Sequence, residues 1–289
     1  MLILHRPFRT ETDYAPMLGL HREVYGIVRG PICCTVGELE WWRFQENDPD
    51  AEIASTQLWE TRDGALVAYA WPGPRYMNLM VHPGHRELLE PILAWAEEQQ
   101  RNRLNGPPDL TTEAVDSDRE HVGVLRSRGY EPTGPSRDWR IRSLETAIPA
   151  FDPPAGFSIR HLAYPEDLRQ RASLAEHPYS AHLVRAPTYR PDLNLAVVAP
   201  DGRFAAFCTA WLDEQNRVGV FEPVECLPEF RRRGLTRAMM CEGMHRLRRL
   251  GAVDACIVNR SENLPAKRLY ESLGFRAVGQ ITEWRKSIP

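Results

Sequence analysis

The stretch Glu225-Cys-Leu-Pro-Glu-Phe-Arg-Arg-Arg-Gly-Leu-Thr236 joins an apolar, β-prone segment to a segment with helical periodicity. Residues 218–227 form the β-prone segment, and residues 237–250 carry apolar side chains at helical spacing. We therefore expect the basic turn at 231–233 to lie at the N-terminus of a helix. Unpaired N–H groups and the positive end of the helix dipole gather there, and arginine adds positive charge. The stretch predicts a site for a phosphate ester, although a solvated turn before a surface helix would have a similar composition.

A second stretch, Asn263-Leu-Pro-Ala-Lys-Arg-Leu-Tyr-Glu-Ser-Leu-Gly-Phe275, follows after room for a helix and a strand. Together the two stretches resemble the signatures of the GNAT-type N-acetyltransferases. The first signature, Arg/Gln-x-x-Gly-x-Gly/Ala, is matched by Arg231, Gly234 and Thr236, with threonine in place of the last small residue. The second signature, Asn-x-x-Ala-x-x-Leu-Tyr-x-x-x-Gly-Phe, is filled without a gap. The resemblance by motif covers residues 218–275.

The composition excludes several classes of protein. The chain has 289 residues, 43% of them hydrophobic, and a net charge of −3, which suits packed cores and gives no general attraction to nucleic acid. The sequence has no apolar run of about 18 residues that could span a membrane, and its charged start does not fit a signal peptide. The six cysteines form no paired motif, so neither a disulfide framework nor a metal site is expected. We expect a cytoplasmic monomer or homodimer without nucleic-acid or membrane partners.

The chain contains an internal repeat. Met80-Val-His-Pro-Gly-His-Arg86 is similar to the segment 225–231, and both Pro83 and Gly129 recur 145 residues later, as Pro228 and Gly274. Between the copies, residues 147–156 hold three prolines and a glycine without periodicity, which is typical of a linker. We predict two domains, residues 1–146 and 157–289. Strands alternate with helices in each, so the predicted fold is α/β, with two GNAT-like domains that each have a mixed central sheet flanked by helices.

The first copy lacks the residues that would hold a cofactor. Arg86 is followed by Glu87 and not by further arginines and a glycine, so an acidic group lies where a diphosphate would approach. The positions that match Asn263 and Tyr270 hold Asp118 and Leu125. We expect a degenerate domain that serves as a wall of the substrate site, a cap or a dimer surface. The alternative is a decayed copy retained for folding.

The resemblance implies acetyl-CoA, or a related acyl-CoA, as the co-substrate. Its diphosphate would lie on the helix N-terminus, and its pantetheine arm would pair with the edge of a strand that splays from its neighbour. The cofactor-binding residues implied in this way are Val224, Glu225, Cys226, Arg231, Arg232, Arg233, Gly234, Leu235, Thr236, Asn263 and Tyr270. Asn263 could equally be only the residue that opens the helix before Pro265.

Acyl transfer from a thioester to an amine needs one group that removes the amine proton and one that protonates the leaving thiolate. Tyr270 occupies the family's position for the second role; a core tyrosine is the alternative. Glu222 and Glu225 compete for the first role, and Pro223 between them indicates a bulge that breaks the alternation of strand faces. We favour Glu222, which follows an apolar run and can be desolvated, while a bound water is a further alternative. Cys226 would allow a covalent route, although a buried strand residue is the simpler interpretation.

The acceptor side is the least defined part of the prediction. The family would form it from the first helices of each copy, here residues 13–25 and 167–177, and from the loop 182–190. Aromatic residues that could line a pocket, or only pack in a core, are Trp41, Trp42, Tyr189 and Trp211.

We expect an N-acetyltransferase that acts on a primary amine of a small molecule or peptide by direct attack in a ternary complex. One alternative is a non-catalytic acyl-CoA sensor or interaction protein. The other is a transferase that uses a tRNA donor, which the acidic balance of the chain disfavours.

Overall fold

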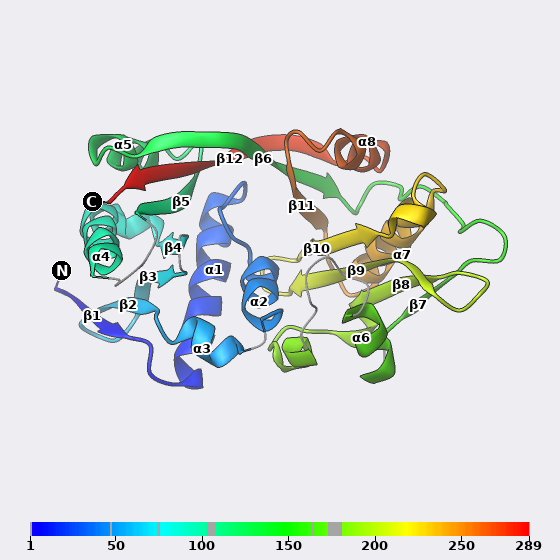
Figure 1. Cartoon of the computed structure of the whole chain (residues 1–289), viewed down its shortest axis with the longest axis horizontal. Coiled ribbons are helices and arrows are strands. Elements are labelled where there is room, and N and C mark those ends of the chain that lie inside the picture. The colour runs from blue at the N-terminus through cyan, green and yellow to red at the C-terminus, as the bar shows by residue number, and fades with distance from the viewer. Residues whose placement is uncertain are drawn as a thin grey trace.

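The computed structural model describes residues 2–46, 48–73, 76–102, 108–162, 165–172 and 181–288, which form two halves that lie side by side (Figure 1). The first half consists of β1 (Ile3–Pro7), α1 (Tyr14–Val28), α2 (Val36–Phe44), α3 (Pro49–Ile53), β2 (Gln57–Thr61), β3 (Leu66–Pro72), β4 (Met77–Val81), α4 (Leu89–Arg101), β5 (Asp109–Val115), α5 (Arg119–Ser127) and β6 (Glu131–Ser143). The second half consists of β7 (Ser158–His161), α6 (Pro165–Ala172), β8 (Asn194–Val198), β9 (Phe204–Asp213), β10 (Val218–Cys226), α7 (Leu235–Arg249), β11 (Asp254–Arg260), α8 (Leu264–Ser272) and β12 (Arg276–Ser287). The predicted α/β class is confirmed.

The two halves repeat the same order of elements. β5, α5 and β6 of the first half begin 145 residues before β11, α8 and β12 of the second half (254 − 109 = 145). This offset is the one that the paired sequence motifs share. The segment between the halves, residues 147–156, contains neither helix nor strand, as the prolines predict.

The last strand of each half lies in a ladder with the other half. The larger sheet has the order β5-β12-β6-β11-β10-β9-β8-β7, and the smaller sheet has the order β1-β2-β3-β4. β12 of the second half pairs antiparallel with β5, and β6 of the first half pairs antiparallel with β11. β6 and β12 also pair with each other and run together across the molecule (Figure 1). The predicted domains therefore exchange their last strands, and the boundary at 147–156 stays a prediction.

Helix starts follow the capping chemistry of the sequence. At α2, the Thr35 hydroxyl accepts from the Glu38 amide (3.3 Å), and the Glu38 carboxylate accepts from the Thr35 amide (2.8 Å), which makes a capping box. At α8, the Asn263 side chain accepts from the Ala266 amide (3.2 Å). At α7, Gly234 precedes the helix with a φ of +79°, a left-handed conformation that favours glycine. These caps position the helices that reach the site.

The two halves meet through α2, which belongs to the first half and packs on β9 and β10 of the second (Figure 1). Gly37 permits this close approach, because a Cβ at that position would lie 2.5 Å from the Cβ of Trp211. One turn further along α2, the Thr188 amide of the second half donates to the Glu40 carboxylate (2.9 Å). Side chains of α2 are therefore enclosed by the second half.

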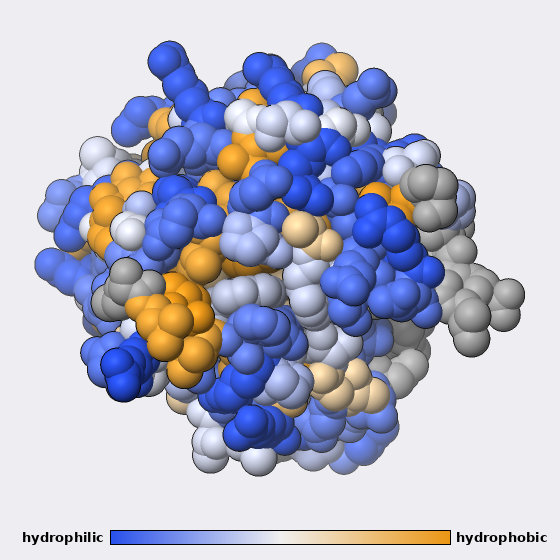
Figure 2. All heavy atoms as spheres, turned by 90° about the vertical axis from the view of Figure 1, so that its left-hand side faces the viewer, coloured by the Kyte–Doolittle hydropathy of each residue, from blue (hydrophilic) through white to orange (hydrophobic). Residues whose placement is uncertain are grey.

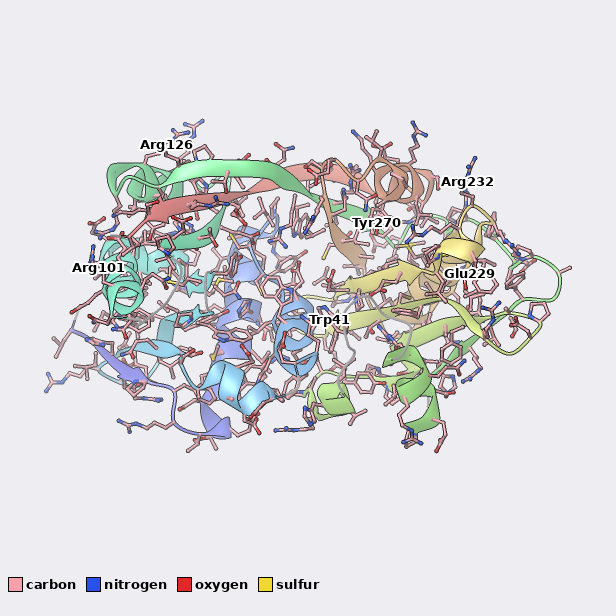
Figure 3. All side chains as sticks on the ribbon, in the orientation of Figure 1. Trp41, Arg101, Arg126, Glu229, Arg232 and Tyr270 are labelled. Carbon is pink, nitrogen blue, oxygen red and sulfur yellow. The ribbon has the colours of Figure 1, made fainter. Side chains whose placement is uncertain are left out.

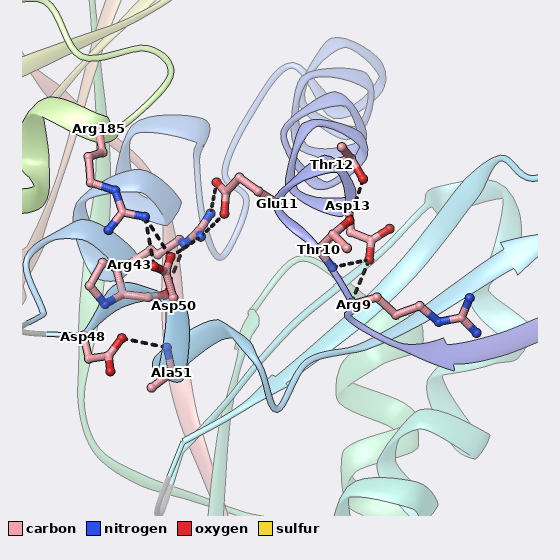
Figure 4. A network of polar contacts seen from close by, with 11 residues as sticks. Arg9, Thr10, Glu11, Thr12, Asp13, Arg43, Asp48, Asp50, Ala51 and Arg185 are labelled. Atoms are coloured by element: carbon pink, nitrogen blue, oxygen red, sulfur yellow. Dashed lines mark hydrogen bonds and ion pairs between the residues drawn. The ribbon is translucent and has the colours of Figure 1, made fainter.

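An ionic network also joins the halves (Figure 4). The buried Arg43 guanidinium pairs with Glu11 (2.5 Å) and Asp50 (3.3 Å) of the first half. Asp50 also pairs with Arg185 of the second half (2.9 Å). Because Arg43 is fully buried, its two carboxylate partners offset the cost of removing its charge from water.

The helices predicted at the start of each half are found where they can be described. The helix predicted at 13–25 is α1, and α6 covers the start of the helix predicted at 167–177, of which residues 173–177 lie outside the described residues. Within the described ranges, no helix has the length and hydropathy needed to cross a bilayer. The end of the first half is a mainly hydrophilic face with separate hydrophobic groups (Figure 2).

Candidate active site

β10 and β11 lie side by side at one end only. Residues 218–220 pair in parallel with residues 254–256, and beyond this point β10 continues along β9 alone. The edge of β10 from Phe221 to Cys226 is therefore open on the β11 side within the described sheet. The predicted pantetheine-binding segment, Val224 to Cys226, lies in this open stretch.

A bulge interrupts β10 at the position where the sequence has a proline. The pairing of β10 with β9 shifts register between Phe221 and Val224. Glu222 lies in this bulge, and its carbonyl accepts a hydrogen bond from the Trp211 indole (2.7 Å). Because of the register shift, the alternation of a regular strand does not decide how Glu222 and Glu225 are oriented. The indole bond fixes the backbone of Glu222.

Glu222 is half-buried among other charged groups. Its pKa rises from 4.5 to about 8, chiefly because burial disfavours the ionised form. The carboxylates of Glu38 and Glu225 also raise this pKa, and the Arg137 guanidinium opposes them. Glu38 is 2% exposed and comes from α2 of the first half, and burial raises its pKa as well. Acidic side chains from both halves therefore lie within electrostatic reach of each other at the bulge.

Tyr270 lies on α8 and is 6% exposed, with its ring centroid 6.2 Å from that of Phe275. Figure 3 shows it below α8. Burial, and then the negative charge of Glu222, raise the pKa of Tyr270 above its ordinary value of 10, so the phenol stays protonated at neutral pH. The structure thus brings Tyr270 and Glu222, which come from different motifs, within electrostatic reach of each other.

The turn before α7 presents main-chain donors. Arg232 has a φ of +63° and Gly234 a φ of +79°, and left-handed residues in such a turn direct neighbouring N–H groups into an anion-binding concavity. Among the described residues, none accepts a hydrogen bond from the N–H groups of residues 232–237. Figure 3 shows Arg232 and Glu229 at this end of the second half. The turn can therefore bind an anion through its backbone.

The three arginines of the turn differ in what they contact. Arg231 donates from Nε to the Cys226 carbonyl (3.0 Å), and Arg233 donates to the Glu229 carbonyl (3.3 Å). Both of these guanidinium groups brace the turn, while their positive charge stays at its surface. All three side chains are exposed, so they can add attraction to an anion on the amides.

Phe151 of the linker covers this turn and was not predicted from the sequence. A Cβ on Gly234 would lie 2.8 Å from the Phe151 ring, and the guanidinium carbon of Arg237 lies 5.0 Å from the centre of that ring. A proline-rich linker gives no sequence signal for such a contact. The close approach requires glycine at 234, in addition to its positive φ.

The remaining predicted cofactor residues have local structural contacts. The Asn263 side chain caps α8, and its role beside the cofactor arm stays a prediction. Leu235 is 1% exposed, so only its backbone can reach a ligand at the turn. Burial raises the pKa of the Cys226 thiol, which donates to the Leu227 carbonyl (3.7 Å). Within the described residues, no group of three or more His, Cys, Asp or Glu side chains could hold a metal ion.

The aromatic residues predicted for the acceptor side pack in the junction between the halves. Trp211 is 1% exposed and lies against α2, and Trp41 is 7% exposed. Trp42 and Tyr189 pack against the same core cluster, and the Tyr189 hydroxyl accepts from Asn194 (2.9 Å). Their effect on the site is indirect, through the bond from Trp211 to the Glu222 backbone.

Sequence reasoning also missed Glu38 and Arg137 as neighbours of Glu222. The Thr-x-x-Glu spacing at 35–38 is a recognisable helix cap, but nothing in it indicates contact with the other half. Arg137 lies on β6, whose exchange into the second half brings it to the site. It also pairs with Glu113 on β5.

Comparisons with known proteins agree with this fold. Residues 158–275 match the model of the acetyltransferase (GNAT) family. A GCN5-related N-acetyltransferase from Sphaerobacter thermophilus is 20% identical, with 99% of this chain and 96% of that chain covered and a TM-score of 0.66. A tandem GNAT protein from the clavulanic acid biosynthesis pathway is 17% identical, with 100% and 99% covered and a TM-score of 0.69. No curated protein matches the sequence. The second half of the chain therefore carries a GNAT acetyltransferase family domain, within a chain that has the fold of a tandem GNAT protein.

Proposed function

We propose that the second half transfers an acetyl group from acetyl-CoA to a primary amine. One arrangement carries this proposal: the open edge of β10 connects a turn with unpaired N–H groups to a bulge that holds Glu222, within electrostatic reach of Tyr270. The match of residues 158–275 to an acetyltransferase family supports the same reaction class.

Acetyl-CoA would bind along this edge. The N–H groups of residues 232–236 would hold its diphosphate, with the exposed arginines 231–233 adding charge. The pantetheine arm would pair with the main chain of Val224 to Cys226, which would place the thioester near the bulge. Asn263 would act by fixing the start of α8, and so the position of Tyr270.

In the reaction, the amine nitrogen attacks the thioester carbon directly in a ternary complex. A C–N bond forms, the C–S bond breaks, and the nitrogen loses a proton to Glu222, with Glu225 or a bound water as the alternative acceptor. Tyr270 donates its phenolic proton to the leaving sulfur and regains a proton from solvent. Direct transfer fits the raised pKa of Cys226, which keeps that thiol protonated and weakly nucleophilic.

The charges at the bulge favour an acceptor that carries positive charge. Glu38 and Glu225 both act on Glu222 there, and Arg137 is the cation that opposes them. An ammonium group would be attracted by the ionised carboxylates and would lose one proton to solvent before attack, which leaves Glu222 to accept the second proton. We propose a cationic small molecule or peptide as the acceptor, in the cytoplasm.

Turnover assays with defined amines test the proposal. The protein is incubated with acetyl-CoA and spermidine, an aminoglycoside or a lysine peptide, and released CoA thiol is measured. We expect release that requires an amine and one CoA bound per chain by calorimetry. In Glu38→Gln we expect a KM for the amine several-fold higher and an unchanged Kd for CoA. Glu52→Gln, which changes an exposed glutamate of α3, serves as the matched control.

A non-catalytic acyl-CoA sensor is the alternative function. It predicts tight CoA binding without release of thiol on any amine. Failure to bind CoA would overturn both functions, and two bound CoA molecules would show that the first half retains a cofactor site.

A further inference from the structure

The segment of residues 182–193, which we call the strap, precedes β8 of the second half, yet it lies against α2 of the first half. Leu183 and Ala186 of the strap are buried in the same core cluster as Phe44 of α2. The strap ends at Leu193, which is fully buried in another core cluster, formed mainly by the second half. The strap therefore connects the cores of the two halves.

An exposed and a buried polar contact hold the strap on the first half. At the surface, Arg185 pairs with Asp50 (2.9 Å, Figure 4), but 43% and 60% of these side chains are exposed, so solvent screens the pair. In the interior, one oxygen of Glu40 on α2 accepts hydrogen bonds from the Thr188 amide (2.9 Å) and from the Thr188 hydroxyl. Glu40 is fully buried, so water does not readily replace these two bonds. Glu40 is therefore the stronger anchor.

The residue after Thr188 contacts a side chain of the proposed active site. The Tyr189 ring lies edge-on to the Trp211 ring, with 6.4 Å between the two centroids. Gly37 of α2 also packs on Trp211, which is 1% exposed. The Trp211 indole donates to the Glu222 carbonyl in the bulge of β10 (2.7 Å). The helix α2 therefore acts on Trp211 twice, directly at Gly37 and through the strap.

We propose that Glu40 is a positioning residue for Glu222. Its bonds to Thr188 hold the strap where Tyr189 supports Trp211, and the Trp211 indole in turn holds the backbone of the bulge. Glu40 itself is too deeply buried to meet a substrate, so its whole effect on the reaction passes through these contacts. The role of Glu222 as base rests on the proposed acetyl transfer, whereas the chain of contacts does not.

Hydrogen exchange of indole N–H groups tests the chain of contacts without any substrate. The first half provides an internal control, because the Trp71 indole donates to the Glu52 carbonyl (2.7 Å) in the same way as Trp211 donates to Glu222. The exchange rates of both indole N–H signals are measured by ¹H–¹⁵N NMR on the full-length chain. Trp71→Phe and Trp211→Phe assign the two signals.

The decisive variant is Glu40→Leu, which removes the acceptor of both Thr188 bonds at similar side-chain volume. We expect the Trp211 indole to exchange about tenfold faster or more, and the Trp71 indole to stay within about twofold of its rate in the unaltered protein. Glu40→Gln keeps an oxygen that can accept these bonds and should largely restore the Trp211 rate. Val184→Thr, at an exposed position of the strap, is the matched control and should leave both rates unchanged.

Turnover separates a positioning role from a purely structural one. In Glu40→Leu we expect kcat to fall about tenfold, because the base is displaced. The Kd for CoA should stay within about twofold, because Arg231 and Arg233 brace the turn before α7 through their own contacts. If Glu40→Leu does not fold, Thr188→Val, which removes only the hydroxyl bond, should show the same two changes at about threefold.

Three results would each overturn the proposal. They are an unchanged Trp211 exchange rate in the variant that folds, an equal rise at Trp71, which would mean a general loosening, and faster Trp211 exchange with unchanged kcat. Failure of the proposed function is distinguishable from these results. It would appear as no amine-dependent thiol release in the unaltered protein, and the exchange rates would still decide whether Glu40 maintains the Trp211 bond.

Discussion

The turn between β4 and α4 and the turn between β10 and α7 are equivalent positions in the two halves, and their backbone donors are used differently. In the first half, the Gly84 amide donates to the His82 side chain and the His85 amide donates to the His82 carbonyl (2.9 Å). In the second half, the N–H groups of residues 232–237 have no acceptor among the described residues. The first turn uses these two donors internally, and the second leaves its donors unpaired within the described part of the chain.

The same contrast holds for the groups that would perform the chemistry. Tyr270 on α8 corresponds to Leu125 on α5, and Gly234 corresponds to Leu89, both 145 residues apart. Leu125 and Leu89 are buried core residues. The scaffold is thus shared by both halves, while the predicted site residues at these positions occur only in the second. The predictions below test this division.

The largest effect is expected from Tyr270→Phe, which makes the second half resemble the first at this position. Loss of the proton donor should lower kcat about 100-fold or more, whereas the Kd for CoA should stay within twofold. Thiol release and calorimetry measure the two quantities. Tyr130→Phe, at a buried tyrosine of the first half, is the control and should leave both unchanged. If kcat of Tyr270→Phe equals that of the unaltered protein, Tyr270 has no part in the reaction.

The tyrosine, the turn and the bulge could be predicted because local chemistry determines them. The positive φ of Gly234, the cap at Asn263 and the register shift at Pro223 each follow from residue types within a few positions. The helix–strand order of both halves follows from periodicity in the same way.

The exchange of β6 and β12 could not be predicted, and neither could its consequences. The side-chain pattern of β6 or of β12 would be the same whether the strand paired with β5 or with β11. The choice of partner therefore depends on long-range packing. Arg137 reaches Glu222 only because of this exchange, and Glu38 only because α2 packs on β10. The fold of each half was readable from the sequence, but the part of the site built from both halves was not.

Glu222 is expected to give a distinct pH dependence. Because its pKa is about 8, the carboxylate is mostly protonated at pH 7, and kcat/KM should rise toward pH 8 as the base ionises. Glu222→Gln should remove this limb and lower kcat/KM about tenfold or more at pH 8.5. Glu225→Gln, which removes the rival base in the same strand, is measured beside it and should keep the limb. A limb retained in Glu222→Gln and lost in Glu225→Gln would assign the base to Glu225.

The raised pKa of Glu222 also affects stability. The pKa of the Glu222 carboxyl is about 8 in the folded state and 4.5 in the unfolded chain. Its contribution to the free energy of unfolding is therefore complete below about pH 4.5 and is lost as the pH rises through about 8. The free energy of unfolding should therefore fall less between pH 5 and pH 9 in Glu222→Gln than in the unaltered protein. Urea unfolding at the two pH values measures the difference.

The smallest effect, and the sharpest comparison of turns, is expected from Gly234→Ala beside Gly202→Ala. Both glycines have a positive φ, +79° and +84°, so each alanine should lower the free energy of unfolding by about 1 kcal/mol. Only at 234 would the new Cβ meet another side chain, the Phe151 ring at 2.8 Å, because the space around Gly202 is open. Gly234→Ala should therefore shift the donor turn and weaken CoA binding about tenfold, while Gly202→Ala leaves it unchanged. Equal CoA affinities in the two variants would mean that the turn before α7 does not hold the cofactor, because a ligand bound to these amides must respond to their displacement.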